Sequence, residues 1–139
     1  MIHYAVVIPA YNEASTIRDV TCRALAQCAD VIVVDDGSTD DTAGAIADLP
    51  AVLLRNGKNL GKAASLWRGM QHAISLGATS VITLDADNQH QPEDIPRFLE
   101  LACKHPDHII IGSRMEDGRS FPRRRYIANR IANFWISWA

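Results

Sequence analysis

The feature that most restricts the fold of this chain is a set of short apolar runs rich in β-branched residues. Four of them stand out, at residues 4–8, 31–34, 80–84 and 108–111, and a weaker fifth lies at residues 51–54. Apolar residues that follow one another, rather than alternate with polar ones, are typical of strands buried on both faces, as in a parallel sheet. The runs therefore predict the strands of an α/β sheet.

Between these runs, apolar residues recur every three or four positions, which is the period of an amphipathic helix. The three sets are Ile17, Val20, Ala24 and Cys28; Ala63, Trp67, Met70 and Ile74; and Ile95, Phe98, Leu99 and Ala102. Ser38 with Asp41 resembles a capping box that opens a short helix at 40–47, and Gly77 is placed to end the middle helix. Alternating strands and helices predict βαβ units with right-handed crossovers in an open α/β sheet.

Length and charge limit the classes of protein to consider. At 139 residues the chain is expected to be one domain, and its formal net charge of −2 argues against a nucleic-acid-binding protein. The charges are unevenly distributed, because acidic residues dominate stretches 35–48 and 85–94. Arginines gather near the C-terminal end, at Arg114, Arg119, Arg123, Arg124, Arg125 and Arg130. This distribution suits a cation-binding centre and an anion-facing tail.

The three cysteines and the termini indicate a compartment. Cys22, Cys28 and Cys103 are odd in number and form no C-x-x-C pair, which suits reduced cytosolic thiols. The sequence has neither a signal-peptide pattern at its start nor an apolar stretch of the roughly 18 residues that a membrane span needs. We expect a cytoplasmic location. Contact with the membrane from the cytoplasmic side is compatible with this sequence.

Polar clusters follow the predicted strands, at residues 9–13, 35–38, 85–89 and 112–114. In parallel α/β sheets, ligands bind beyond the carboxyl ends of the strands. Because the four clusters follow the carboxyl ends of strands, we expect them to meet at one edge of the sheet and form a site there.

Asp85-x-Asp87-x-Gln89, directly after a predicted strand, is the most informative of these clusters. Two carboxylates and an amide oxygen are hard ligands that suit Mg²⁺ or Mn²⁺. If the segment is extended, Asp87 and Gln89 project to the same side and can face one ion together with a phosphate. The alternative is an acidic loop that favours the start of the next helix through Glu93 and Asp94. The placement of the motif after a strand, beside the other clusters, favours the metal site.

Other polar residues are candidates for a nucleotide site. Asp36 can accept a hydrogen bond from a base or a ribose hydroxyl, although Asp-Gly-Ser is also good turn chemistry. Tyr11 offers a flat face to a nucleobase, or packs simply, and Pro9 fixes the backbone at the exit of the first strand. Glu13 can bind a base or a ribose donor, or favour the first turn of a helix.

Gly61 and Lys62 stand at a predicted helix start, which is a natural place for a diphosphate, although Lys62 also fits an ordinary surface lysine.

Taken together, segments 7–13, 34–42, 59–62, 84–87, 89–90 and 112–114 resemble the successive motifs of family 2 glycosyltransferases. Their order and spacing are most similar to the dolichyl-phosphate mannosyltransferase branch and its bacterial polyprenyl-phosphate relatives. The resemblance covers Met1 to about Arg130. It implies the GT-A fold, a Rossmann-like, open and mostly parallel sheet flanked by helices.

The resemblance also implies roles for individual residues. Those that would hold the nucleotide sugar are Pro9, Ala10, Tyr11, Glu13, Asp36, Lys62, Asp85 and Ala86. Asp87 and Gln89, with Asp85, would bind Mg²⁺ or Mn²⁺. Arg114 would approach the donor or acceptor phosphate and, with Asp87, serve catalysis. The family implies inversion at the anomeric carbon and, in the lipid-phosphate branch, an acceptor phosphate that is already an anionic nucleophile.

The C-terminal part departs from the pattern of the family, whose members continue into an acceptor-side half. We expect a nucleotide-sugar-binding core at 1–118 and, at 119–139, a basic amphipathic segment that begins the missing half. Its apolar stripe is formed by Ile127, Ile131, Phe134 and Trp138, with Trp135 beside it. Such a segment can lie on a membrane, hold an acceptor lipid phosphate, pack against the sheet or pair two copies of the chain.

Three functions remain open from the sequence. The first is an inverting, metal-dependent transferase that moves a sugar from a UDP- or GDP-sugar to an acceptor, such as a polyprenyl phosphate. The second is a module that binds a nucleotide sugar without transferring it, because the acceptor half is absent. The third, a nucleotidyltransferase, is disfavoured because the first predicted strand is not followed by a glycine-rich basic loop.

Overall fold

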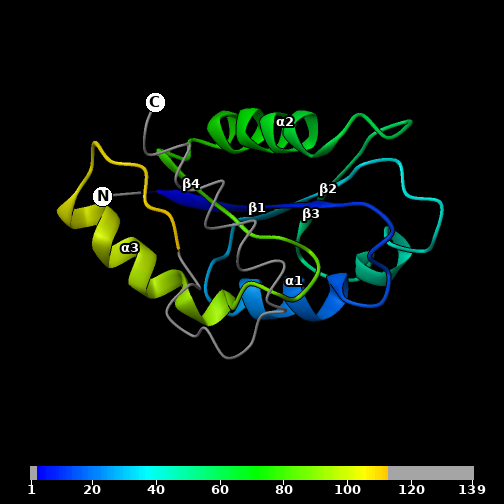
Figure 1. Cartoon of the computed structure of the whole chain (residues 1–139), viewed down its shortest axis with the longest axis horizontal. Helices are drawn as coiled ribbons and strands as arrows, with labels where there is room; N and C mark the ends of the chain where they lie inside the picture. The colour runs from blue at the N-terminus through cyan, green and yellow to red at the C-terminus, as the bar shows by residue number, and fades with distance from the viewer. Residues whose placement is uncertain (1–2, 113–139) are drawn as a thin grey trace, which may run out of the picture. The chain divides into compact units, whose positions relative to one another are not determined.

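The computed structural model describes residues 3–112. The chain divides into two compact units, Met1–Pro106 and Asp107–Ala139. The helices and strands of the described part all lie in the first unit, which is a sheet covered by helices on both faces (Figure 1). Within residues 3–112, no helix is both long and apolar enough to span a bilayer.

The sheet consists of four parallel strands in the order β3-β2-β1-β4. Their bounds are Tyr4–Ala10 for β1, Val31–Asp35 for β2, Val52–Arg55 for β3 and Ser80–Thr83 for β4. The two central strands, β1 and β2, are the most buried, since neighbours pair with them on both sides. The structure confirms the parallel α/β sheet and four of the five predicted strands.

The run at 108–111 was predicted as a strand, and this prediction was wrong. In the described part of the chain it forms no strand, and the side chains of Ile109 and Ile111 are 92% and 83% exposed. A strand needs a neighbour that satisfies its backbone groups, and β-branched residues favour a strand only in that context. The three isoleucines alone therefore did not determine the local structure.

Helices α1 (Ile17–Leu25) and α3 (Ile95–Lys104) cover one face of the sheet, and α2 (Lys62–Ser75) covers the other (Figure 1). Successive strand residues point to opposite faces. Val6 and Ile8 of β1 accordingly belong to the core cluster on the α1 side, and Ala5 and Val7 to the cluster on the α2 side. Both faces of β1 are thus apolar, which explains the continuous apolar run in its sequence.

The predicted helix in α2 is confirmed, but its buried face is not the apolar stripe. The residues buried against the sheet are the small Ser65, Gly69 and Ala73, whereas the side chains of Trp67 and Ile74 are 62% and 64% exposed. A Cβ atom added at Gly69 would lie 2.4 Å from Cγ1 of Val7. The helix therefore packs close to the sheet because its inner residues are small.

The helix ends agree with the sequence in one place and differ in another. Gly77 has φ of 87°, and the amide of Ala78 donates to the carbonyl of Ala73, as in a Schellman motif. The helix predicted at 40–47 is a single 3-10 turn, η1 (Gly44–Ile46). The carboxylate of Asp40 accepts hydrogen bonds from the amide and hydroxyl of Thr42, and such local bonds compete with a helix.

The predicted capping box does not form, because the Ser38 hydroxyl accepts a hydrogen bond from the amide of Asn12 instead.

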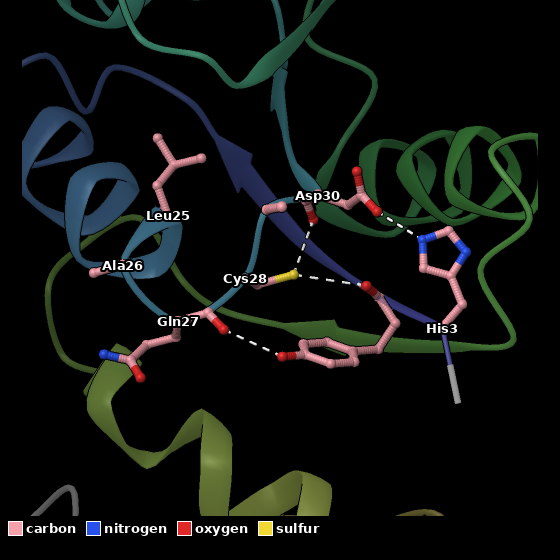
Figure 2. A pocket seen from close by; sticks show the side chains of 8 residues that line it. His3, Leu25, Ala26, Gln27, Cys28 and Asp30 are labelled. Atoms are coloured by element: carbon pink, nitrogen blue, oxygen red, sulfur yellow. Dashed lines mark hydrogen bonds and ion pairs between the residues drawn. The ribbon is translucent and has the colours of Figure 1, made fainter. Parts of the chain in front are cut away.

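A hollow of about 430 Å³ lies at the amino-terminal end of the sheet, where β1 begins (Figure 2). Its lining includes an ion pair between His3 Nε2 and Asp30 Oδ2 at 2.6 Å and the Tyr4 hydroxyl, which donates to the carbonyl of Gln27. None of the predicted site residues lines this hollow. The polar clusters that follow β1, β2 and β4 lie at the other edge of the sheet.

Candidate functional site

The loops that follow the four strands leave the sheet at one edge, formed by the carboxyl ends of β1–β4 and called here the carboxyl edge. Parallel pairing aligns Ala10 of β1 with Asp35 of β2, and the amide of Leu84, just after β4, donates to the carbonyl of Val7. The amide of Asn56, after β3, donates to the carbonyl of Asp35. The predicted convergence of the loops after β1, β2 and β4 is therefore confirmed.

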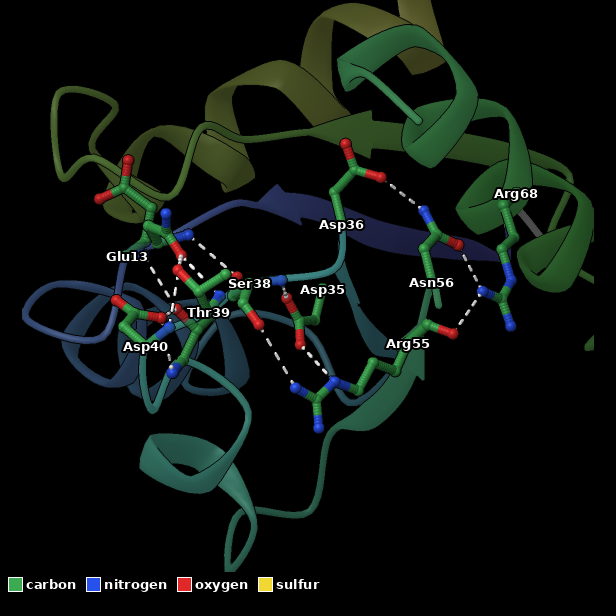
Figure 3. Close-up of polar contacts among 11 residues, drawn as sticks. Glu13, Asp35, Asp36, Ser38, Thr39, Asp40, Arg55, Asn56 and Arg68 are labelled. Atoms are coloured by element: carbon green, nitrogen blue, oxygen red, sulfur yellow. Dashed lines mark hydrogen bonds and ion pairs between the residues drawn. The ribbon is translucent and has the colours of Figure 1, made fainter. Parts of the chain in front are cut away.

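The loops after β1 and β2 are tied together by side chain to backbone hydrogen bonds (Figure 3). The side-chain oxygen of Asn12 accepts a hydrogen bond from the backbone amide of Thr39 at 2.8 Å. The backbone amide of Asn12 donates to Ser38 Oγ at 2.9 Å. The Glu13 amide donates to Thr42 Oγ1 at 2.9 Å. Asn12 has φ of 56°, a conformation that asparagine tolerates better than most residues. The motif that follows β2 thus fixes the loop that follows β1.

Asp40 strengthens the same tie. Its carboxylate accepts hydrogen bonds from the Thr42 hydroxyl, from the amide of Thr42 at 3.0 Å and from the amide of Ala14 at 3.1 Å. These bonds, the Thr42 hydroxyl first, lower the pKa of Asp40 below its ordinary value. Sequence reasoning assigned no role to Asn12, Asp40 or Thr42, although short polar side chains in turns are the general signal for such bonds.

The adjacent carboxylates Asp35 and Asp36 point in different directions, and each has its own partners (Figure 3). Asp35 is fully buried, and its Oδ1 accepts from the amide of Ser38 at 2.9 Å. Its Oδ2 lies 3.0 Å from Arg55 Nε, outside the alignment of a hydrogen bond. The expected repulsion between neighbouring carboxylates is thus offset by a cation on one and by hydrogen bonds on both.

Asp36 is only 3% exposed, and its carboxylate accepts three protein hydrogen bonds. The donors are Asn56 Nδ2 at 2.7 Å and the amides of Leu60 at 2.9 Å and Gly61 at 2.8 Å. Burial acts to raise the pKa of Asp36, but these hydrogen bonds, that from the Leu60 amide first, outweigh burial and lower it. The ionised Asp36 therefore holds the loop that leads into α2. Its contact with a base or ribose stays a prediction.

A second layer of residues supports Asp36. Asn56, 4% exposed, donates through Nδ2 to both Asp36 and Ser65 Oγ and accepts at Oδ1 from Arg68 Nη1 at 2.5 Å. Arg68 also donates to the carbonyl of Arg55 at 2.8 Å. Figure 3 shows this chain running from Arg68 through Asn56 to Asp36. Sequence reasoning missed Asn56, for which the signal was a lone amide directly after the third strand.

Two predicted site residues from distant segments meet at the carboxyl edge. Lys62, the first residue of α2, places Nζ 2.5 Å from Oδ1 of Asp85, which follows β4. The two side chains are 60% and 33% exposed, so both can be reached from solvent. The backbone amide of Asp85 donates to His90 Nδ1 at 2.9 Å, so this ring nitrogen acts as the acceptor.

The segment after β4 is a turn rather than the extended stretch from which we predicted that Asp87 and Gln89 face one ion. Asn88 has φ of 59°, and the amide of Gln89 donates to Asp87 Oδ1 at 3.0 Å. Alternation along an extended chain therefore does not bring Asp87 and Gln89 to one side. Ala86 is 4% exposed and belongs to the core cluster on the α1 side.

The donor set nevertheless fits a hard cation. Mg²⁺ is usually held by one or two carboxylates, with phosphate and water oxygens completing its octahedron. Asp85 and Asp87 supply two carboxylates in one turn, and Lys62, which pairs with Asp85, suits a phosphate. Within residues 3–112, no group of three or more His, Cys, Asp or Glu side chains forms a site by itself. A metal here would therefore rely on ligand oxygens as well, and the set Asp85, Asp87 and Gln89 stays a prediction.

The other predicted nucleotide-site residues lie at or near the same edge. Tyr11 is 45% exposed just after β1, whereas Pro9 and Ala10 are buried within the strand. Glu13 accepts from the Thr16 hydroxyl at 3.0 Å, at the start of α1, so the structure also supports its alternative helix-start role. Arg114 and the predicted domain boundary at 118 lie outside the described residues.

Comparison with known proteins identifies the class of protein to which this sheet and its loops belong. Residues 5–137 of the chain match the model of glycosyl transferase family 2. The chain therefore belongs to glycosyl transferase family 2 and has the GT-A fold.

Curated relatives indicate a branch of the family. The chain is 35% identical to the undecaprenyl-phosphate 4-deoxy-4-formamido-L-arabinose transferase of Sodalis glossinidius, over 95% of its own length and 42% of the relative's. It is 27% identical to the UDP-N-acetylglucosamine–dolichyl-phosphate N-acetylglucosaminyltransferase of Methanococcus voltae, over 95% of its own length and 59% of the relative's. The chain thus spans only part of the length of these relatives.

Solved structures agree with the fold. The glucosyl-3-phosphoglycerate synthase of Mycobacterium tuberculosis in complex with Mn²⁺, uridine diphosphate and glucosyl-3-phosphoglycerate is similar with a TM-score of 0.54 and 31% identity. The match covers 68% of this chain and 37% of the synthase. A complex of the same synthase with Mn²⁺, UDP-glucose and phosphoglyceric acid gives a TM-score of 0.58 at 29% identity.

Proposed function

We propose that this chain forms the nucleotide-sugar-binding part of an inverting, metal-dependent glycosyltransferase that moves a sugar from a UDP- or GDP-sugar to a polyprenyl phosphate. The observation that carries the proposal is the meeting of Lys62 and Asp85, 2.5 Å apart, beside the exposed loop of Asp87. A cation next to two carboxylates is an arrangement that can receive a diphosphate and a divalent metal together. The Mn²⁺ and uridine diphosphate in the similar synthase support the same ligand class.

Each part of the donor has a candidate partner at the carboxyl edge. The exposed ring of Tyr11 would stack on the base, with Pro9, Ala10 and Glu13 shaping the loop that carries it. Asp36 would hold the loop into α2 and, through its remaining acceptor capacity, meet a base or ribose donor. Lys62 would pair with the diphosphate, and Asp85 and Ala86 would line its path.

Asp85, Asp87 and Gln89 would hold Mg²⁺ or Mn²⁺, whose charge offsets the negative charge that builds on a leaving diphosphate. The ion pair of Asp85 with Lys62 implies an exchange of partners when the donor binds, because one lysine cannot serve the carboxylate and the diphosphate equally well. Among the residues after β4, His90 keeps the backbone of Asp85 in place through its 2.9 Å hydrogen bond.

The acceptor proposal is supported by the names of the relatives, which act on undecaprenyl and dolichyl phosphates. A phosphate oxygen of the acceptor would form a bond to the anomeric carbon from the face opposite the diphosphate, while the bond from that carbon to the diphosphate oxygen breaks and the nucleoside diphosphate leaves, which inverts the carbon. No strong general base is needed because the acceptor phosphate is already ionised. Arg114 would bind a phosphate of the donor or acceptor by forked hydrogen bonds. We place the reaction at the cytoplasmic face of the membrane, with residues 119–139 at the lipid surface or between two copies of the chain.

One titration tests the core of this proposal. The melting temperature is followed while UDP-glucose, UDP-N-acetylglucosamine or GDP-mannose is added with and without Mn²⁺, and free nucleoside diphosphate is measured with and without a polyprenyl phosphate. We expect metal-dependent stabilisation by one donor and release of its diphosphate only with the lipid. Stabilisation without release would instead support a binding module, and no stabilisation by any donor would reject the proposal.

Substitution of Asp87 gives the matched comparison. Asp87→Ala should abolish the metal-dependent part of the shift. Asp48→Ala, which removes a carboxylate paired with Arg18 in the region of η1, should retain it. An unchanged shift in Asp87→Ala would remove this residue from the ligand set.

A further inference from the structure

Arg23, in the last turn of α1, connects that helix to the turn that follows β4. Its guanidinium donates from Nε to Glu93 Oε1 at 2.8 Å and from Nη2 to Glu93 Oε2 at 2.6 Å, which is a bidentate pair. The same side chain donates to Asn88 Oδ1 at 2.7 Å and to Gln91 Oε1 at 2.5 Å. A weaker contact of 3.2 Å reaches Asp19 on its own helix.

Three of these partners lie in residues 88–93, within or just after the turn that carries Asp87. Asn88 stands between Asp87 and Gln89 with φ of 59°, a left-handed conformation that asparagine adopts more readily than most residues. Arg23 restrains this residue from outside the turn, because its hydrogen bond reaches the Asn88 side chain. Contacts at Gln91 and Glu93 fix the far end of the same segment.

We propose that Arg23 is a positioning residue for the metal site: by clamping Asn88, Gln91 and Glu93 it holds the turn in the conformation in which Asp87 meets the cation. This inference rests on the function proposed above. The role of Arg23 is to position the turn through its hydrogen bonds to these three residues. The side chain of Arg23 is only 26% exposed, so its guanidinium is better shielded from water than that of Arg18, the other arginine of α1.

The chemistry of the side chain fits this task. A planar guanidinium presents five donors in a fixed fork, so it can hold a carboxylate and two amide oxygens at once. A lysine would supply one compact charge and could not reproduce the fork. The hydrogen bonds from Arg23 also lower the pKa of Glu93 to about 2, so the carboxylate of this pair is ionised at neutral pH.

Arg18 provides a matched control on the same helix. It also makes a bidentate pair, with Asp48 at 2.6 and 2.8 Å, and donates to the carbonyl of Ala45 at 2.8 Å. Its partners lie around η1 and none of them lies after β4. Loss of either arginine removes one charge and one bidentate pair from α1, but only Arg23 touches the turn of the metal site.

The test compares the full chain with Arg23→Met and Arg18→Met. The affinity for Mn²⁺ in the presence of saturating UDP is measured by electron paramagnetic resonance, the affinity for UDP is measured in EDTA, and melting temperatures are recorded. We expect Arg23→Met to weaken Mn²⁺ binding at least fivefold, with UDP affinity in EDTA changed less than twofold. Arg18→Met and Arg23→Met should lower the melting temperature by similar amounts. Arg18→Met, however, should change the affinity for Mn²⁺ less than twofold.

Two further variants keep the test decisive if Arg23→Met does not fold. Arg23→Lys retains the charge without the fork and should also lose Mn²⁺ affinity, and Glu93→Gln, which keeps the shape of the partner, should show a smaller loss in the same direction. Equal Mn²⁺ affinity in the Arg23 and Arg18 variants would overturn the positioning role and leave the proposed function standing. A wild-type chain that binds neither Mn²⁺ nor UDP would overturn both.

Discussion

Lys62 and Asp85, which are 23 residues apart in the sequence, form an ion pair with 2.5 Å between Nζ and Oδ1. Lys62 opens α2 and Asp85 follows β4, so the pair joins two loops of the carboxyl edge. The lysine lies against an oxygen atom that the sequence predicts to bind a divalent cation. The ammonium group and a metal ion would therefore compete for Asp85 until a diphosphate gives Lys62 another partner.

This competition gives the first prediction, for Lys62→Met. Without nucleotide, removal of the ammonium should strengthen Mn²⁺ binding by about three- to tenfold, because a nearby charge of the same sign is lost, an effect of about 1 kcal/mol for a solvated pair. With Mn²⁺ present, the affinity for UDP should fall instead. Isothermal titration of Mn²⁺ alone, and of UDP with Mn²⁺, measures both effects.

Lys104→Met is the control for this prediction, since it removes a lysine that pairs with Glu100 on α3, away from the carboxyl edge. It should change neither affinity. A weaker affinity for Mn²⁺ alone in Lys62→Met would show that the lysine organises the site rather than competes for it.

The second prediction concerns Gly37, whose backbone has φ of 71° and lies close to the loop after β3. A Cβ atom at this position would be 2.5 Å from the carbonyl carbon of Lys58. Gly37→Ala should therefore lower the free energy of unfolding by more than a left-handed conformation alone costs, which is about 1–2 kcal/mol. Gly57, in the same loop, has open space around its Cα, and Gly57→Ala should stay within about 0.5 kcal/mol. Urea unfolding of the three proteins measures the difference, and equal stability of both variants would contradict the packing described here.

Sequence reasoning succeeded where a pattern is local. The continuous apolar runs identified β1 and β2, which are buried on both faces, and β4, whose partly buried Val81 and Ile82 pack against the core clusters on opposite faces of the sheet. The polar segments after these strands had to meet because the strands are parallel. Figure 1 shows the resulting sheet with helices on both faces. The same reasoning assigned 108–111 to a strand because it could not tell whether a neighbour would pair with it.

The details of the site depend on partners that are distant in the sequence, and no spacing rule indicates them. Asn56 reaches Asp36 across 20 residues, and Arg23 reaches Glu93 across 70. The buried face of α2 was also hidden, since its close approach to Val7 depends on the absence of a side chain at Gly69.

The third prediction concerns Asn56, which donates to the buried carboxylate of Asp36 at 2.7 Å. Asn56→Leu fills similar space but removes this donor, so the free energy of unfolding at pH 7 should fall by about 1–3 kcal/mol, the usual cost of a buried polar group left with too few partners. Chemical denaturation measures the change.

Gln71→Leu is the control for this substitution, because it replaces a side-chain amide by the same apolar group at an exposed position of α2. It should leave the free energy of unfolding within about 0.5 kcal/mol of the wild-type value. If Asn56→Leu behaved like this control, the hydrogen bond from Asn56 to Asp36 would contribute nothing to stability.

The last prediction concerns stability in acid and follows from two carboxylates on the α1 side of the sheet. Arg18 lowers the pKa of Asp48 to about 2, and Arg23 lowers the pKa of Glu93 to about 2, both through side-chain hydrogen bonds. A carboxylate with a lower pKa in the folded state stabilises the fold above its unfolded pKa, and this contribution is lost as the pH falls toward the folded value. The melting temperature should therefore decrease between about pH 4.5 and 2, where the unfolded chain binds more protons than the folded one.

Arg18→Met and Arg23→Met should each reduce this decrease in melting temperature, because the folded pKa of the partner carboxylate returns toward its ordinary value. A melting series from pH 6 to 2 on the three proteins tests this, and a pH dependence that is the same in all three would show that neither ion pair contributes to stability in solution.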